Sequence, residues 1–223
     1  MGAVLPNETL TFVDNLRDRL AAPVFTANLK HSIEGSYSFG FINSSEFIDK
    51  PDAIAYTPVD KSSIYWRFLA TGYGVGSAEE AERTTKTGNP LIVGDSLMVV
   101  NRTYTAIADT GTTLLLVPSR IVRDYYARVA GSLYDSYWAG MVFPCEAVMP
   151  DFSFYIGTGG YKGVVPGRYV NYVSVNGTHC YGGIQSSDAI GFAVFGALAL
   201  KAQFVVFDLG EMRIGFAEKE LST

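Results

Sequence analysis

One acidic residue inside an otherwise apolar stretch constrains the fold of this chain more than any other feature. The stretch 107–116 (IADTGTTLLL) places Asp109 in a short polar turn between two apolar runs. Two buried β-strands joined by a tight turn are the simplest structure with this pattern. A carboxylate in such a place is costly unless its oxygens are hydrogen-bonded or it shares a proton.

The residues beside Asp109 can supply those hydrogen bonds. Thr110 and Thr112 carry hydroxyl groups, and Gly111 lets a backbone N–H approach the carboxylate without a Cβ in the way. Thr113 is either a cleft residue or part of the following strand. Asp109 is therefore a candidate catalytic residue, although an ordinary turn aspartate has the same local sequence.

Composition and charge exclude several classes of function. The chain of 223 residues is 48% hydrophobic, so it can bury a core as one domain, and its 23 glycines, 14 tyrosines and 14 phenylalanines are typical of strands and turns. A formal net charge of −5 without a basic stripe argues against a nucleic-acid partner. No apolar run is long enough to span a membrane. Two cysteines and two histidines form no metal-binding pattern, and no cofactor is predicted.

Periodicity predicts the main elements. A helix is expected over 7–20, a hairpin over 24–42, and an edge strand or loop over 49–60. Further strands are expected over 65–70, 91–100 and 104–116, followed by a helix from 119 to 131 and then short strands between glycines. The polar segment 77–90 is expected to be a surface insertion, with a lid over the active face as the alternative.

Several motifs together resemble a known family. The Asp-Thr-Gly-Thr turn between apolar residues resembles the active-site loop of pepsin-like aspartic peptidases, and the flanking sequence resembles the carboxyl-terminal lobe of their fungal, aspergillopepsin-type branch. The resemblance extends from about residue 12 to residue 216. Its other matching segments, in the same order, are 22–30, 35–42, 149–152, 180–186 and 205–208.

This resemblance implies a mostly β fold with one pepsin-like lobe over residues 1–223. Residues 1–23 would be a helical lead-in, and the lobe would contain a six-stranded type of floor sheet, orthogonally packed sheets that close into a β-barrel, and two or three short helices. In that family each of two lobes supplies one aspartate, and the two carboxylates, about 3 Å apart, share one proton. The sequence contains no counterpart of the amino-terminal lobe's Asp-Thr-Gly or flap tyrosine, so it supplies half of the pair.

Three interpretations remain open. In the first, a second copy in a homodimer, or a separate amino-terminal lobe, supplies the other aspartate for peptide hydrolysis. The resemblance then implies that Thr110 reaches across to the partner's backbone while Thr112 holds its own Asp109. In the second, Asp109 alone acts as general acid or base on a small apolar metabolite, as in an intracellular cyclase or isomerase. In the third, the chain is a non-catalytic binding module.

The resemblance also assigns roles outside the turn. Tyr181, Ile184 and Gln185 match a region that borders the substrate cleft, with plain packing as the alternative, and Tyr104 could face the cleft or the core. Cys145 and Cys180 match a disulfide-bonded pair. Ala197 stands where the family usually has an aspartate, whose absence removes a helix cap worth about 1 kcal/mol. Asp208 is expected to be a turn residue.

The amino terminus as given shows no secretory signal. On that basis the sequence predicts an intracellular protein, or a secreted or vacuolar one if the chain belongs to a longer precursor.

Overall fold

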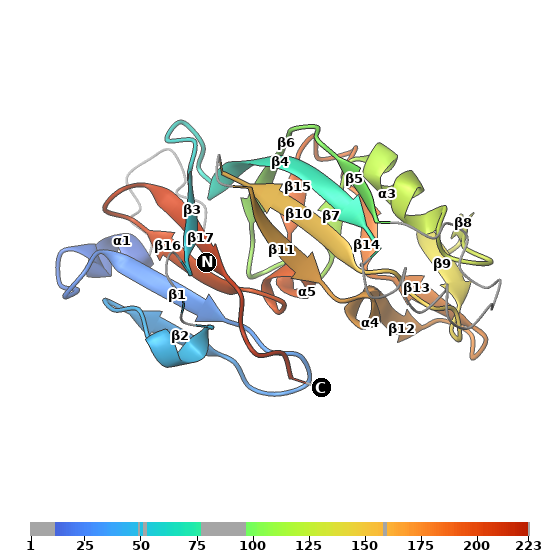
Figure 1. Cartoon of the computed structure of the whole chain (residues 1–223), viewed down its shortest axis with the longest axis horizontal. Helices are drawn as coiled ribbons and strands as arrows, with labels where there is room; N and C mark the ends of the chain where they lie inside the picture. Colours follow the sequence, from blue (N-terminus) through green and yellow to red (C-terminus); the bar gives the residue numbers. More distant parts are fainter. Residues whose placement is uncertain (1–11, 49, 51–52, 77–96, 158–159, 223) are drawn as a thin grey trace.

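The computed structural model describes residues 12–48, 50, 53–76, 97–157 and 160–222. The fold is mostly β, as predicted, and its three sheets follow one another along the long axis of the molecule (Figure 1). The described helices are α1 (Phe12–Arg17), α3 (Ser119–Tyr126), α4 (Gly167–Val170) and α5 (Ala197–Leu200), with a 3₁₀ turn at Ser44–Glu46. This is more than the two or three helices predicted, because α4 and α5 are single turns of four residues.

The first sheet has five described strands and is antiparallel throughout. Its order is β2 (Ser36–Phe39), β1 (Val24–Asn28), β16 (Phe204–Asp208), β17 (Arg213–Ala217) and β3 (Ala55–Pro58). The predicted hairpin over 24–42 is therefore confirmed, and β3 is an edge strand as expected. The described residues give this sheet five strands, not the six that the sequence predicts for the floor sheet.

Among the described residues the second sheet has eight strands, two of which are joined by the acidic turn. Its order is β11 (Tyr161–Val165), β10 (Phe152–Ile156), β4 (Arg67–Val75), β6 (Tyr104–Ala108), β15 (Ala193–Phe195), β7 (Leu115–Val117) and β14 (Ile184–Ser186), with β5 (Met98–Val100) beside β4. Strand β4 continues past the predicted end at residue 70, because its last residues pair with β10 on one side and, where Gly72 allows a close approach, with β5 on the other. A Cβ on Gly72 would lie 2.6 Å from the carbonyl oxygen of Val100.

The third sheet has the order β12 (Asn171–Ser174), β13 (His179–Gly182), β9 (Gly140–Pro144) and β8 (Leu133–Asp135). A disulfide between Cys145 and Cys180 ties the end of β9 to β13, which confirms the predicted pair. It closes a loop of 35 residues, which in the chain-entropy account stabilises the fold by about 3–4 kcal/mol. The described sheets have open edges, so the expected barrel-like closure is wrong.

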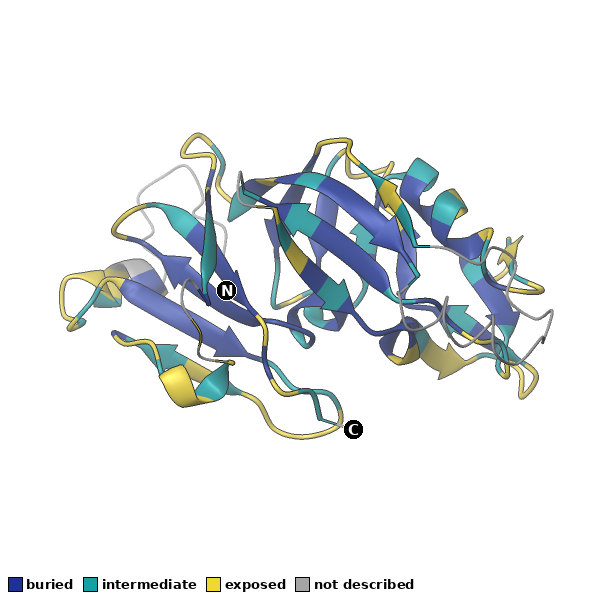
Figure 2. Cartoon of the chain, in the orientation of Figure 1, coloured by how far each residue is buried: buried dark blue, intermediate teal, exposed yellow. Residues whose placement is uncertain are grey.

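The buried core lies directly behind the acidic turn, and the strands that carry it are buried over much of their length (Figure 2). Phe195 at the end of β15 is fully buried; its ring lies 4.9 Å from that of Phe154 and 5.4 Å from that of Phe68, measured between centroids. Burying each such ring contributes about 2–3 kcal/mol. The strands that carry the turn are thus held in place by closely packed aromatic side chains.

The predicted helix after residue 118 is present as α3, and it packs an apolar face against the second sheet. Ile121, Val122, Tyr125 and Tyr126 are buried, and the Tyr126 hydroxyl donates a hydrogen bond to the Ile184 carbonyl oxygen at 2.9 Å. The predicted insertion over 77–90 lies outside the described residues, as do residues 1–11 of the predicted lead-in.

Candidate active site

The carboxylate of Asp109 is held by its own loop, which joins β6 to β7. The backbone N–H of Gly111 donates to Oδ1 of Asp109 at 2.9 Å, and the hydroxyl of Thr112 donates to Oδ2 at 2.7 Å. Each carboxylate oxygen therefore has one donor, and the plane of the carboxylate is fixed. The sequence predicted both donors.

Strand β15 and helix α5 support this loop from behind. Strand β15 lies between β6 and β7, parallel to the first and antiparallel to the second, and the Asp109 N–H donates to the Phe195 carbonyl oxygen at 3.1 Å. Gly196 follows directly, where a Cβ would lie 2.2 Å from the carbonyl oxygen of Leu114. Only glycine fits at this position, where the backbone after β15 passes close behind the acidic loop.

The first two N–H groups of α5 complete the support. Ala197 donates to the Thr112 carbonyl oxygen at 2.6 Å, and Leu198 donates to that of Thr113 at 2.9 Å. Helix α5 begins without a side-chain cap at Gly196, as expected from the alanine at position 197. Because backbone groups at the start of a helix need partners, these two bonds join the helix to the acidic loop.

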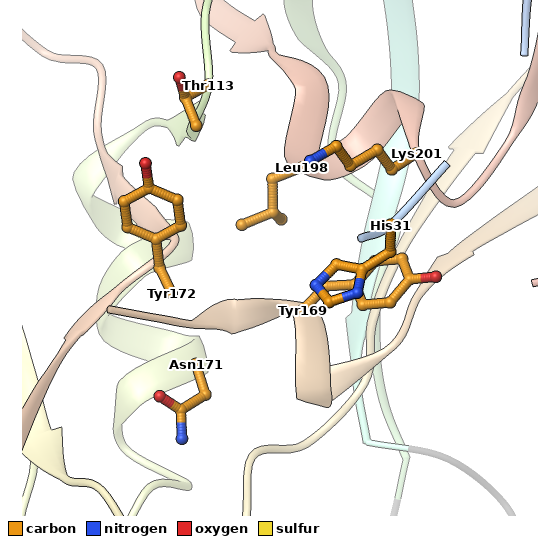
Figure 3. Close-up of a pocket in the computed structure, with 7 residues that line it drawn as sticks. All are labelled: His31, Thr113, Tyr169, Asn171, Tyr172, Leu198 and Lys201. Carbon is orange, nitrogen blue, oxygen red and sulfur yellow. The ribbon is translucent and has the colours of Figure 1, made fainter. Parts of the chain in front are cut away.

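Two hollows flank the loop. One, of about 110 Å³, is shown in Figure 3 and is lined by His31, Thr113, Tyr169, Asn171, Tyr172, Leu198 and Lys201. The other is an open hollow of about 660 Å³, lined by Leu29, Lys30, Ser32, Ile33, Glu34, Gly35, Thr110, Ala197 and Lys201. Thr110 and Thr113 thus line different hollows, and Lys201 borders both.

The remaining predicted site residues lie away from these hollows. Tyr104 is buried in the core beside Phe195; burial raises its pKa, and its hydroxyl has no hydrogen-bond partner within the described part of the chain. Ile184 is fully buried, and the Gln185 side chain is hydrogen-bonded to the backbone of Met141 and Gly182.

Tyr181 lies in β13, over Gly140 of the neighbouring strand β9, and burial raises its pKa. Contact of these residues with a ligand stays a prediction. Asp208 is a turn residue, since its carboxylate accepts from the N–H groups of Gly210 and Glu211 and pairs with Arg213.

The hollow of Figure 3 brings together residues that the sequence did not associate with the site. His31, Tyr172 and Lys201 come from segments far apart in the chain and contain no shared motif.

Other kinds of site find no support in the described ranges. Within residues 12–48, 50, 53–76, 97–157 and 160–222, no group of three or more metal-ligating side chains occurs. The same residues contain no helix long and apolar enough to cross a bilayer.

A carboxylate cradled by Asp-Thr-Gly-Thr, on a loop crossed from behind by a strand and a short helix, is the kind of site found in aspartic peptidases. The eukaryotic aspartyl protease family matches residues 5–219, and the chain belongs to this family.

Curated relatives agree with this assignment. Penicillopepsin-3 of Penicillium janthinellum is 44% identical over 219 residues, covering 97% of this chain and 50% of its own length. Penicillopepsin-1 of Talaromyces stipitatus is 42% identical, and aspergillopepsin-1 of Aspergillus fumigatus is 41% identical, each over 97% of this chain and 49% of its own length. The chain therefore spans about half the length of the curated relatives it matches.

Proposed function

We propose that this chain contributes one of the two carboxylates of an aspartic peptidase, and that it hydrolyses peptide bonds when a second copy or a separate amino-terminal lobe supplies the other. The observation that carries the proposal is the geometry of Asp109. Its two oxygens are each bound by one donor of its own loop. No second carboxyl group of the described residues contacts it.

The chemistry needs that second group. In a carboxylate dyad, the ionised member takes a proton from the attacking water while the protonated member donates to the carbonyl oxygen of the substrate. Gly111 and Thr112 orient Asp109 for either role, because they fix its plane and leave further acceptor positions on both oxygens. Thr110 lines the open hollow, and in this proposal its hydroxyl bonds the backbone of a complementary loop.

The two alternatives have less support. A cyclase or isomerase acting on an apolar metabolite needs an enclosed apolar pocket at Asp109. Of the two hollows beside its loop, one is open and the other measures only about 110 Å³, and both combine apolar side chains with lysine and hydroxyl groups. A binding module does not need a carboxylate fixed by two donors. No particular observation favours either alternative over peptide hydrolysis.

Cleavage of an unfolded protein substrate at acid pH tests the proposal. We expect hydrolysis by the wild-type chain, alone or after addition of an amino-terminal lobe from a relative, and inhibition by a peptide that mimics the transition state. Asp109→Asn should abolish cleavage without changing the thermal stability by more than about 1 kcal/mol. Absence of cleavage at every pH under both conditions, with a folded protein, would contradict the proposal.

A further inference from the structure

The small hollow beside the acidic loop has an unusual charge for this chain. Of the seven residues that line it, Lys201 is a full cation and none is acidic, although the chain as a whole carries a formal net charge of −5. Burial, followed by the positive charges of Lys201 and Arg168, lowers the pKa of His31, which lines the same hollow. The field inside the hollow is therefore positive.

The hollow also presents unused hydrogen-bond donors. Within the described part of the chain, the Lys201 ammonium, the Tyr172 hydroxyl and the Thr113 hydroxyl make no hydrogen bond or ion pair to another side chain or to the backbone. In Figure 3 the Lys201 side chain extends toward the Thr113 and Tyr172 side of the hollow, above Leu198, and the Tyr172 hydroxyl points toward Thr113. In the same view the Thr113 hydroxyl points away from the hollow, so an anion there would meet the donors of Lys201 and Tyr172.

The side chains in the lower part of the hollow already have partners within the protein, which hold them in place. The His31 ring stacks on that of Tyr169 with centroids 4.5 Å apart, and the Asn171 amide donates to the Cys145 carbonyl oxygen at 3.1 Å. The remaining wall is the apolar side chain of Leu198. This combination of a stacked aromatic floor, an aliphatic wall and an ammonium group at the rim suits a short aliphatic stem that ends in a carboxylate.

The volume of the hollow further limits which ligands can fit. The hollow measures about 110 Å³, well below the roughly 300 Å³ at which pockets begin to enclose a whole small molecule. It therefore accommodates a single side chain or a chain end of a larger ligand. Thr113 and Leu198 connect it to the acidic loop, because the Leu198 N–H donates to the Thr113 carbonyl oxygen at 2.9 Å.

We propose that this hollow binds a carboxylate group of the peptide that lies along the acidic loop, with Lys201 as the residue that selects it. The proposal rests on the proposed function, since it names the class of peptide that the same site takes: one with an acidic side chain, or a free carboxyl terminus, near the bond placed at Asp109.

Direct binding tests the inference without requiring cleavage. The ¹⁵N-labelled full chain is titrated at low salt with three small probes: N-acetyl-glutamate amide, N-acetyl-glutamine amide and N-acetyl-alanine. We expect the glutamate probe to shift the amide signals of Thr113 and Leu198 and to bind about three- to fivefold more tightly than the glutamine probe, with the difference reduced by salt. Equal shifts by N-acetyl-alanine would assign the hollow to a chain terminus, and their absence would assign it to a side chain.

Variants identify the residue responsible. Lys201→Met should remove the preference for glutamate over glutamine, and Lys201→Arg should retain it. Lys30→Met is the matched control, because Lys30 lines only the open hollow, and it should leave the preference intact. The inference is wrong if the glutamate probe does not shift Thr113 and Leu198, if both amides bind equally, or if Lys30→Met has the same effect as Lys201→Met. Binding with this preference by a chain that cleaves nothing would contradict the peptidase proposal alone.

Discussion

At the scale of single residues, the two donors to Asp109 define what the acidic turn can do. The Thr112 hydroxyl is 2.7 Å from Oδ2, and hydrogen bonds to charged groups are stronger than neutral ones. Thr112→Val should therefore lower the free energy of unfolding by about 1–2 kcal/mol at neutral pH. Urea unfolding measures this loss, and Thr112→Ser, which keeps the hydroxyl, should show little of it. A loss in Thr112→Ser but not in Thr112→Val, which keeps the methyl group, would mean that the methyl group and not the hydrogen bond matters.

A second residue-scale prediction concerns Lys219, which is buried near the end of the chain. Its ammonium donates to Oδ1 of Asn28 at 3.0 Å and to the Leu29 carbonyl oxygen. Burial, followed by the charge of Lys30, lowers its pKa from 10.5 to about 8, while Glu46 acts in the opposite direction.

Because the folded pKa lies below the unfolded one, the unfolded chain binds more protons between pH 8 and 10.5. The cost of the buried charge is present in full below pH 8 and is relieved as the pH rises through this window. This residue should thus add on the order of 2 kcal/mol of stability between the two ends of the window. Unfolding free energies of wild type and Lys219→Met should diverge across this range, and parallel curves would contradict the prediction.

At the scale of elements, the crossing of β15 behind the acidic loop is the tightest point of the site. A Cβ on Gly196 would meet the backbone oxygens of Leu114 at 2.2 Å and Thr112 at 2.5 Å. Since backbone cannot move aside as a side chain can, Gly196→Ala should destabilise the protein by about 2–4 kcal/mol and displace the Asp109 loop. Thermal unfolding measures the first effect. Ala197→Gly, one residue along, should cost no more than about 1 kcal/mol.

The sequence predicts an element well when residues close together in the chain determine it, and poorly when a distant strand does. The hairpin of β1 and β2 and the apolar face of α3 follow from alternation and helical spacing, which neighbouring residues determine. The end of β4 does not, because Gly72 lies in a strand through its pairing with Tyr155 of β10 and the close approach of Val100 from β5. A glycine run predicts a turn unless those distant partners are known.

The same distinction applies to the candidate site. Asp109, Gly111 and Thr112 lie within four consecutive positions, so their hydrogen bonds can be predicted from the turn sequence alone. The hollow that contains Lys201 and His31 cannot, because the two residues are brought together by the pairing of β1 with β16 and by the position of α5. Tyr104 could have faced either side of its strand, and only the packing against Phe195 decides for the core.

At the scale of the whole molecule, the source of the second carboxylate decides how activity depends on concentration. If a second copy supplies it, a two-fold axis brings two Asp109 side chains together, and the specific activity should rise with protein concentration and fall on dilution. If a separate lobe supplies it, activity should instead saturate with added lobe. Light scattering at acid pH should show a dimer in the first case only.

Mixing wild type with Asp109→Asn separates the two cases more sharply. With random pairing of equal amounts, only about a quarter of the dimers retain two aspartates, so activity should fall to about a quarter of that of the same total amount of wild type. A separate lobe pairs with each chain independently, so the same mixture should keep about half. The Asp109→Asn chain must pair as well as wild type for this comparison, which its sedimentation profile checks. A residual activity of about a quarter therefore identifies a site formed by two copies of this chain, and a residual activity of about a half identifies a site completed by a different polypeptide.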